Sequence, residues 1–299
     1  MSRAAPSPTS IYAAATAGIA VFSVMDMVMK ALVLDLGTYP TLLWRSLAGT
    51  IAAAGLMAWY RPGWPGRAAV KFHVLRGVVS AAMALLFFWG LARVPMAQAV
   101  ALTFIAPLIA LVLAAVVLHE KLGARVIGGS LLALAGVGVI VAGQVRAPAG
   151  PHLLAGSAAV LGSAVIYAWN IVLMRQQALV AGPVEIAFFQ NLTVAGSLLL
   201  ILPLSGGAPV PHGHWAGLAL AVVLAIVSQL TLAWAYARAG AAYLSSSEYS
   251  SFLWAMLLGW LYFREPVAGA TLAGAGLITV GCLAAARSRQ EPGEAAQLT

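Results

Sequence analysis

Asp26 and Lys30 are two opposite charges inside the first apolar run of the chain, where ionisable groups are expensive. An ionisable side chain at the centre of a membrane span costs at least about 2.5–3.5 kcal/mol, so each one calls for an explanation. Because the two residues are four positions apart, they lie on one face of a helix. They either form an internal ion pair with each other or face a cavity, where they would meet the charged groups of a zwitterion.

Arg45 lies a few residues into the second apolar run, after Pro40. Two interpretations stay open for it. The guanidinium group could extend to the outer headgroups, or it could bind an anionic group of a substrate.

A polar tract from Tyr243 to Ser251 opens the ninth apolar run. A helix that faces lipid could not carry it, so the tract must face protein or water. Either it lines a transport pathway or its hydroxyl groups only bond neighbouring helices. Within it, Glu248 is a candidate for proton coupling.

Amide and aromatic side chains within other apolar runs complete the candidate site. Amides in spans often serve helix packing, and Trp residues near span ends often anchor a helix at the membrane surface, although aromatic rings can also enclose cationic ligands. The predicted substrate-binding residues are Asp26, Arg45, Trp89, Gln98, Tyr167, Trp169, Asn170, Gln190, Asn191, Gln229, Ser245, Glu248, Tyr249 and Trp254.

Several other chemistries have no support in the sequence. There is no Walker A loop, no Gly-x-Ser-x-Gly elbow and no His-Glu-x-x-His motif, and the single cysteine, Cys282, gives no disulfide framework. We therefore expect no cofactor and no metal site. An intramembrane enzyme would need a paired acid and base, which only Asp26 and Glu248 could supply.

The composition sets the elements that must position these residues. Of 299 residues, 62% are hydrophobic and 8% are charged, and the mean hydropathy is +0.96. A span needs roughly 20 apolar residues. The sequence predicts an all-α integral membrane protein with ten spans near 11–32, 41–60, 74–93, 96–118, 124–144, 153–173, 184–204, 215–236, 242–263 and 268–286.

Basic residues are scattered at the ends of these runs, so the net charge of +8 indicates topology and not nucleic-acid binding. With a cytoplasmic N-terminus, eleven of the sixteen Lys and Arg residues lie on the inner side. The positive-inside rule therefore predicts that both termini are cytoplasmic.

The second half of the chain repeats the first after 145 residues, the separation of Trp89 and Trp234. Other matched pairs are Arg93 and Arg238, Glu120 and Glu265, Gly129 and Gly274, and Gly136 and Gly281. Five spans per half is an odd number, which predicts two inverted repeats with a binding site between them. We assign residues 1–10 to a cytoplasmic tail, 11–146 to the first repeat, 152–287 to the second and 288–299 to a cytoplasmic tail.

These motifs resemble the drug/metabolite transporter superfamily, in particular its EamA-type members. The resemblance is carried by residues 101–107, 118–123, 128–138 and 262–266 and by the glycines from Gly274 to Gly281. The second half departs from the family pattern at Phe252, which stands in the place of Pro107 and puts the corresponding helix break in doubt. The resemblance implies ten helices, a bacterial inner-membrane location and metabolite export, and it favours a functional role for Arg45.

The predicted function is export of small polar metabolites, amino acids first, by alternating access. The partners would be the small-molecule substrate and the lipid bilayer. A proton-coupled importer of the same architecture and an exporter of drugs or other metabolites are the alternatives, since alternating access by itself does not fix the direction of net flux.

Overall fold

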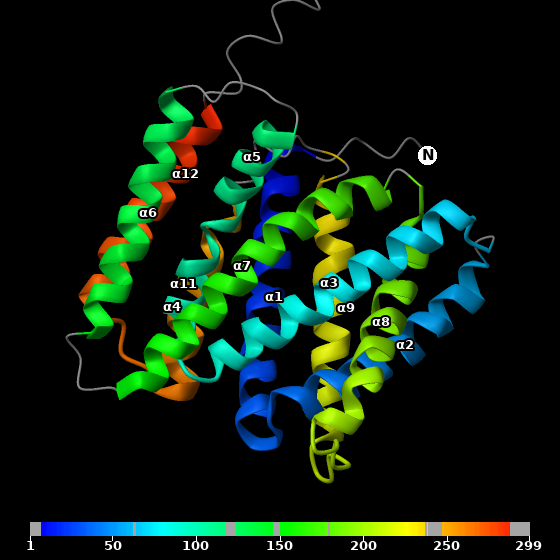
Figure 1. Ribbon diagram of the computed structural model, residues 1–299. Coiled ribbons are helices and arrows are strands. Elements are labelled where there is room, and N and C mark those ends of the chain that lie inside the picture. The colour runs from blue at the N-terminus through cyan, green and yellow to red at the C-terminus, as the bar shows by residue number, and fades with distance from the viewer. Residues whose placement is uncertain are drawn as a thin grey trace, which may run out of the picture.

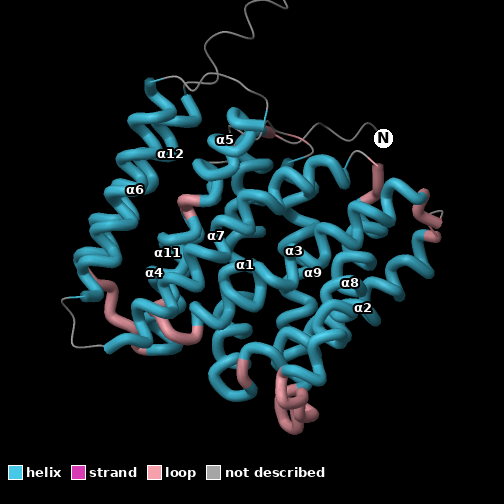
Figure 2. The backbone as a smooth tube through the Cα atoms, viewed as in Figure 1, coloured by secondary structure: helices cyan, strands magenta, loops and turns pink. Residues whose placement is uncertain are grey.

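The computed structural model describes residues 7–61, 64–117, 124–145, 150–178, 180–236, 238 and 247–287, and this part of the chain is helical without strands (Figures 1 and 2). Its helices are α1 (Pro8–Leu36), α2 (Thr38–Tyr60), α3 (Arg67–Leu91), α4 (Met96–Thr103), α5 (Ala106–Val117), α6 (Ala124–Val145), α7 (Gly150–Ala178), α8 (Pro183–Ile201), the short 3₁₀ helix η1 (Leu202–Leu204), α9 (Trp215–Tyr236), α11 (Ser250–Phe263) and α12 (Gly269–Arg287).

Six of these helices are long and apolar enough to cross a membrane: Thr9–Leu36, Thr38–Tyr60, Ala69–Leu91, His152–Met174, Pro183–Leu204 and Trp215–Ala235. Four shorter apolar helices, Met96–Ala110, Ile127–Gly143, Ser250–Phe263 and Gly269–Gly281, fall within the predicted fourth, fifth, ninth and tenth spans. The fold is therefore that expected for a membrane protein, with apolar helices at the predicted places.

The turn between α1 and α2 depends on one glycine. Gly37 has a φ of 87°, a conformation that glycine adopts without a side-chain clash, and its N–H group donates to the carbonyl of Val33. The chain thus ends α1 and starts α2 within a single residue. Such a tight turn holds two long helices next to each other.

The predicted fourth span is divided into two helices. α4 ends at Thr103 and α5 begins at Ala106, one residue before Pro107. Proline has no N–H to donate to the carbonyl four residues earlier, and its ring crowds that carbonyl. In the second half a turn at Tyr249 directly precedes α11 although Phe252 replaces the proline. The helix boundary at this matched position therefore does not require a proline.

The most extensive helix–helix contacts each join one helix from the first half of the chain to one from the second. These pairs are α6 with α12, α3 with α7, α1 with α9, and α2 with α8. In Figure 1, α6 and α12 lie side by side at one edge of the molecule, and α2 and α8 lie toward the opposite edge. The hydrophobic core thus forms largely between the two halves.

Glycines allow α6 and α12 to approach closely. A Cβ atom on Gly136 would lie 2.6 Å from the carbonyl oxygen of Gly274, and a Cβ on Gly281 would lie 2.5 Å from that of Gly129. The lower-numbered glycine of α6 therefore meets the higher-numbered glycine of α12, so the two helices run antiparallel. Small residues at such contacts permit the backbone-to-backbone packing that is typical of membrane helices.

Candidate functional site

Asp26 and Arg45 bring opposite charges together in the interior. Asp26 on α1 is 5% exposed, and it interacts electrostatically with Arg45 on α2. Asp26 lies ten residues before the end of α1 and Arg45 eight residues after Gly37, so both are roughly 12–15 Å from the α1–α2 turn, near the middle of a span. Two predicted site residues thus lie within electrostatic range of each other at the depth at which a carrier binds its substrate.

Both side chains have a polar atom that can form a further hydrogen bond. Asp26 Oδ1 and Arg45 Nε are buried and have no hydrogen-bond partner among the described residues. The same holds for Oε1 of Gln190 on α8, which is the repeat counterpart of Arg45, and for Oγ of Ser250 at the start of α11. Buried polar atoms are normally satisfied, so the unsatisfied atoms of Asp26 and Arg45 indicate a place where a polar ligand can bind.

Lys30 does not pair with Asp26, which contradicts one of the two sequence interpretations. Its ammonium group forms an ion pair with Glu265 and donates to the carbonyl of Val94 at 2.8 Å. The other carboxylate oxygen of Glu265 accepts from the N–H of Met96 at 2.7 Å, which caps the start of α4. Asp26 therefore has Arg45 as its charged neighbour, and Lys30 serves to join the two halves.

Glu248, Tyr167 and Arg76 form a second polar group. Tyr167 on α7 interacts electrostatically with Glu248, which precedes α11, and with Arg76 on α3. Glu248 itself is exposed. Two more predicted site residues, Tyr167 and Glu248, are thus brought together from distant parts of the chain, with Arg76 as a neighbour that the sequence prediction did not include. The predicted site residue Ser245 lies outside the described residues.

Two matched residues meet where the fourth and ninth runs are interrupted. The rings of Phe104 and Tyr249 are edge to face, with centroids 5.2 Å apart and planes at 84°. Both rings line a cavity of about 490 Å³, which Ser250 also borders. This contact brings the start of α11 in the second half next to the end of α4 in the first half.

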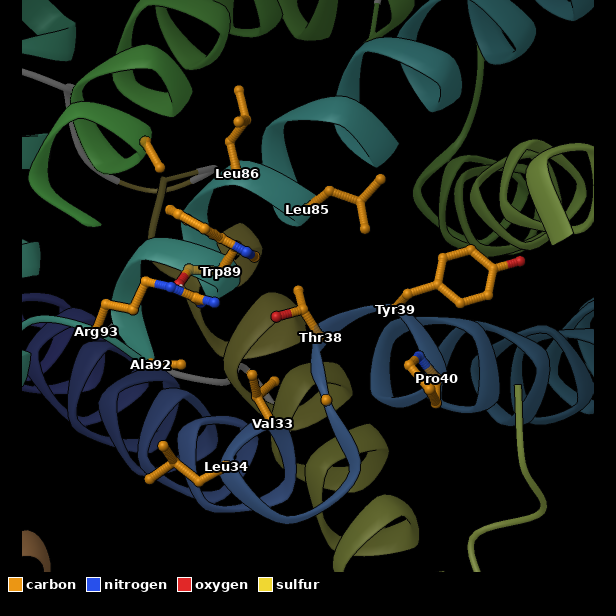
Figure 3. Close-up of a pocket in the computed structure, with 12 residues that line it drawn as sticks. Val33, Leu34, Thr38, Tyr39, Pro40, Leu85, Leu86, Trp89, Ala92 and Arg93 are labelled. Carbon is orange, nitrogen blue, oxygen red and sulfur yellow. The ribbon is translucent and has the colours of Figure 1, made fainter. Parts of the chain in front are cut away.

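A larger cavity of about 840 Å³ opens beside the α1–α2 turn (Figure 3). Trp89 and Arg93 from α3 and its C-terminal end lie on one side of it, and Thr38 and Tyr39 from α2 lie on another. The Arg93 guanidinium group stacks 3.6 Å from the centre of the Trp89 ring. The predicted site residue Trp89 therefore lines a cavity, although most other lining residues are apolar.

Three predicted amides form hydrogen bonds with other protein groups. Gln98 donates to Ser157 Oγ at 3.0 Å, Asn170 accepts from Ser80 at 3.5 Å, and Asn191 donates to the carbonyl of Ala187 at 2.9 Å. The first two bonds join neighbouring helices, whereas the Asn191 bond lies within α8.

The last three predicted residues make no polar contact within the described part of the chain that defines a site. Trp169 and Gln229 are exposed, and Trp254 is half-buried. No group of three or more His, Cys, Asp or Glu residues within the described ranges is placed to hold a metal ion.

The sequence prediction missed a buried polar cluster around His73 on α3. His73 Nε2 lies 2.8 Å from Oε1 of Glu185, and His73 Nδ1 lies 2.7 Å from Nε2 of Gln177. Arg76 donates to Oε1 of Gln177 at 2.5 Å. The available signal was an acidic residue in the first turn of an apolar helix and a histidine at the start of another, which sequence alone could not connect.

A family model of EamA-like transporters matches residues 9–142 and again residues 154–287. The chain belongs to the EamA-like transporter family. This confirms the resemblance drawn from the motifs, and membership in a family of transporters favours a carrier over an intramembrane enzyme.

This EamA-family chain is also similar to a named exporter and to a solved structure. The pseudopaline exporter CntI of Pseudomonas aeruginosa, in strains UCBPP-PA14 and PAO1, is 27% identical over 273 residues, which cover 90% of this chain and 93% of the relative. A crystal structure of a protein that is 22% identical aligns with a TM-score of 0.58 and covers 95% of this chain and 100% of the other. That second likeness supports the fold alone.

Proposed function

We propose that this EamA-family protein is a secondary transporter that exports small polar metabolites, amino acids first, across the bacterial inner membrane. One observation carries the proposal: the Asp26 carboxyl group and the Arg45 guanidinium group lie within electrostatic range of each other in the interior, and each keeps a buried polar atom without a hydrogen-bond partner in the described part of the chain. The ammonium group of a zwitterion would pair with Asp26, and its carboxylate would pair with Arg45. A bidentate guanidinium–carboxylate contact would also fix the orientation of the substrate.

Alternating access would take place between two inverted repeats of five spans each, residues 11–146 and 152–287, with tails at 1–10 and 288–299. The two family matches begin at residues 9 and 154, which is the same offset of 145 residues that separates Trp89 from Trp234. Helix bounds follow this offset as well: α3 ends at Leu91 and α9 at Tyr236. The antiparallel contact of α6 with α12 supports opposite orientations of matched helices.

The orientation follows the distribution of basic residues. The stretch between the predicted second and third spans holds Arg61, Arg67, Lys71 and Arg76, whereas the matching residues 206–221 contain no Lys or Arg. We therefore place both termini in the cytoplasm, so that the α1–α2 turn and the Lys30–Glu265 ion pair lie toward the outside.

Export is supported by the relative, which is named an exporter. Export of a metabolite such as pseudopaline is the second candidate, because that relative aligns with nearly the whole chain. The charges of Asp26 and Arg45 suit any substrate that carries both an ammonium and a carboxylate group.

The test uses purified protein in proteoliposomes, with counterflow of labelled amino acids and with an imposed pH gradient. Saturable transport is expected. Asp26→Asn and Arg45→Gln should each lower kcat/KM at least roughly tenfold, which corresponds to about 1.4 kcal/mol of lost binding. Asp35→Asn is the matched control, since the side chain of Asp35 is 63% exposed. If both site variants transport as well as the wild type, the site is elsewhere, and if only pseudopaline is moved, the amino-acid proposal fails.

A further inference from the structure

Four polar side chains form a continuous buried chain at the junction of α3, α7 and α8. The order is Arg76, Gln177, His73 and Glu185, with successive contacts of 2.5, 2.7 and 2.8 Å. His73 and Gln177 are fully buried, and the His73 ring stacks on Phe189 with centroids 4.6 Å apart. The chain connects α3 of the first half to α7 and α8 of the second, at the ends of these helices farthest from the Lys30–Glu265 pair.

The donors and acceptors in this chain admit one arrangement. A guanidinium group can only donate, so the group of Gln177 that faces Arg76 must be its carbonyl oxygen. The amide nitrogen of Gln177 then faces His73 and donates, so Nδ1 of His73 must carry no proton. His73 is consequently neutral, with its proton on Nε2, which donates to the Glu185 carboxylate.

A proton on Nδ1 would break this arrangement. It would point at the amide nitrogen of Gln177, a contact between two donors. Rotation of the Gln177 amide would relieve that contact but would turn its nitrogen toward the donors of Arg76. In either case one buried hydrogen bond is lost, and buried donors without partners are costly. The packed junction therefore disfavours a second proton on His73.

The matched junction at the other end of the molecule shows that packing does not require these polar groups. In the repeat, Leu218 stands in place of His73, Leu32 in place of Gln177, Pro40 in place of Glu185 and Ala221 in place of Arg76. Leu32 and Leu218 are buried at 5% and 1% exposure, so this counterpart is closed by apolar contacts. The polar chain is thus an addition to a junction that apolar side chains can close.

We propose that His73 is a proton-binding site whose occupancy opens the junction of α3 with α7 and α8. The packed junction holds His73 in the neutral form, and a proton from water binds Nδ1 when α3 separates from α7 and α8.

The charged and titratable groups at the site are Glu185 on α8 and Arg76 on α3, and Arg76 in turn interacts with Tyr167 on α7. Because Tyr167 interacts with Glu248, the chain continues toward the candidate pathway. The coupling of this site to transport rests on the proposed function, whereas the proton site itself does not.

The first experiment measures the protons on the His73 ring. The full-length protein, labelled with ¹⁵N-histidine, is studied in lipid bilayers by solid-state NMR, and the His73 signal is assigned as the one missing from His73→Gln. At neutral pH we expect one neutral form of the His73 ring, with its proton on Nε2. A His73 ring that carries both protons at neutral pH, or its single proton on Nδ1, overturns the proposal.

A matched variant tests the role of Gln177. In Gln177→Glu a carboxylate can accept from both Arg76 and a protonated Nδ1, so both His73 nitrogens should carry protons at neutral pH. If they do not, the tautomer is not set by Gln177 and the proposal is wrong.

Transport measurements test the coupling. In His73→Leu, which introduces the residue of the matched junction, counterflow should continue, but transport driven by a pH gradient should fall at least roughly tenfold. His214→Gln is the control and should respond to the gradient as the wild type does. Full gradient-driven transport by His73→Leu overturns the coupling. If the protein moves no amino acid at all, the proposed substrate class fails, while the NMR result still decides whether the proton site exists.

Discussion

The ammonium group of Lys30 on α1 forms an ion pair with the carboxylate of Glu265, 235 residues later in the chain. The same carboxylate caps the start of α4 through the N–H of Met96. One acidic side chain from the second half thus holds two helices of the first. This contact and the chain through His73 lie at opposite ends of the helices, so the two halves are joined by polar contacts at both ends.

Loss of one partner of the Lys30–Glu265 pair should destabilise the protein strongly. In Lys30→Met the Glu265 carboxylate stays partly buried without its cation, and such single losses cost about 3–5 kcal/mol. The double variant Lys30→Met/Glu265→Gln should lose less stability than the sum of the losses in the two single variants. Each single variant leaves one unpaired charge, whereas the double variant leaves none. Thermal unfolding in detergent would measure this. Additive effects would show that the pair does not contribute to stability.

The α6–α12 contact predicts opposite effects at two nearby glycines. Gly136→Ala should lower stability by about 1–3 kcal/mol, because its Cβ would lie 2.6 Å from the carbonyl oxygen of Gly274. Gly138→Ala on the same helix should have no effect or stabilise by up to about 1 kcal/mol, because a Cβ there meets nothing within 4 Å and alanine favours the helix. Comparable unfolding midpoints for the two variants would argue against close packing of α6 on α12.

The proposed topology predicts different labelling of two exposed positions. In a Cys282→Ser background, Ser205→Cys should react with an impermeant thiol reagent added to whole cells with a permeable outer membrane. Gly66→Cys should react only after the inner membrane has been opened. Both positions are exposed, so access to the reagent depends on the side of the membrane alone. The reverse pattern would place the termini outside.

Variants of Gln98 and Asp26 should have different defects: the first in stability, the second in KM. Gln98 donates a buried hydrogen bond to Ser157 at 3.0 Å, so Gln98→Leu should lower stability by about 1 kcal/mol and leave KM unchanged. Asp26→Asn should raise KM with little loss of stability, since Asp26 Oδ1 has no hydrogen-bond partner among the described residues. Equal KM effects in the two variants would indicate that Gln98 also contacts substrate.

Much of the architecture could be predicted from the sequence, because it depends on local properties. The lengths of apolar runs, the turn residues between them and the 145-residue offset are all read directly along the chain. They place six long apolar helices and four shorter ones correctly and lead to the EamA-like family. The inverted orientation of the repeats and the location of the termini stay predictions from the same patterns.

The choice of partners was decided by the tertiary structure. Spacing along one helix made Lys30 a candidate partner for Asp26, yet Lys30 pairs with Glu265 and Asp26 has Arg45 beside it. His73 and Glu185 are 112 residues apart and meet only because α3 packs against α8. Hydropathy is a property of each segment, so the sequence by itself determines which segments form apolar helices. A buried charge must find its partner wherever packing brings one within reach, so only the folded arrangement of the helices determines which charges meet.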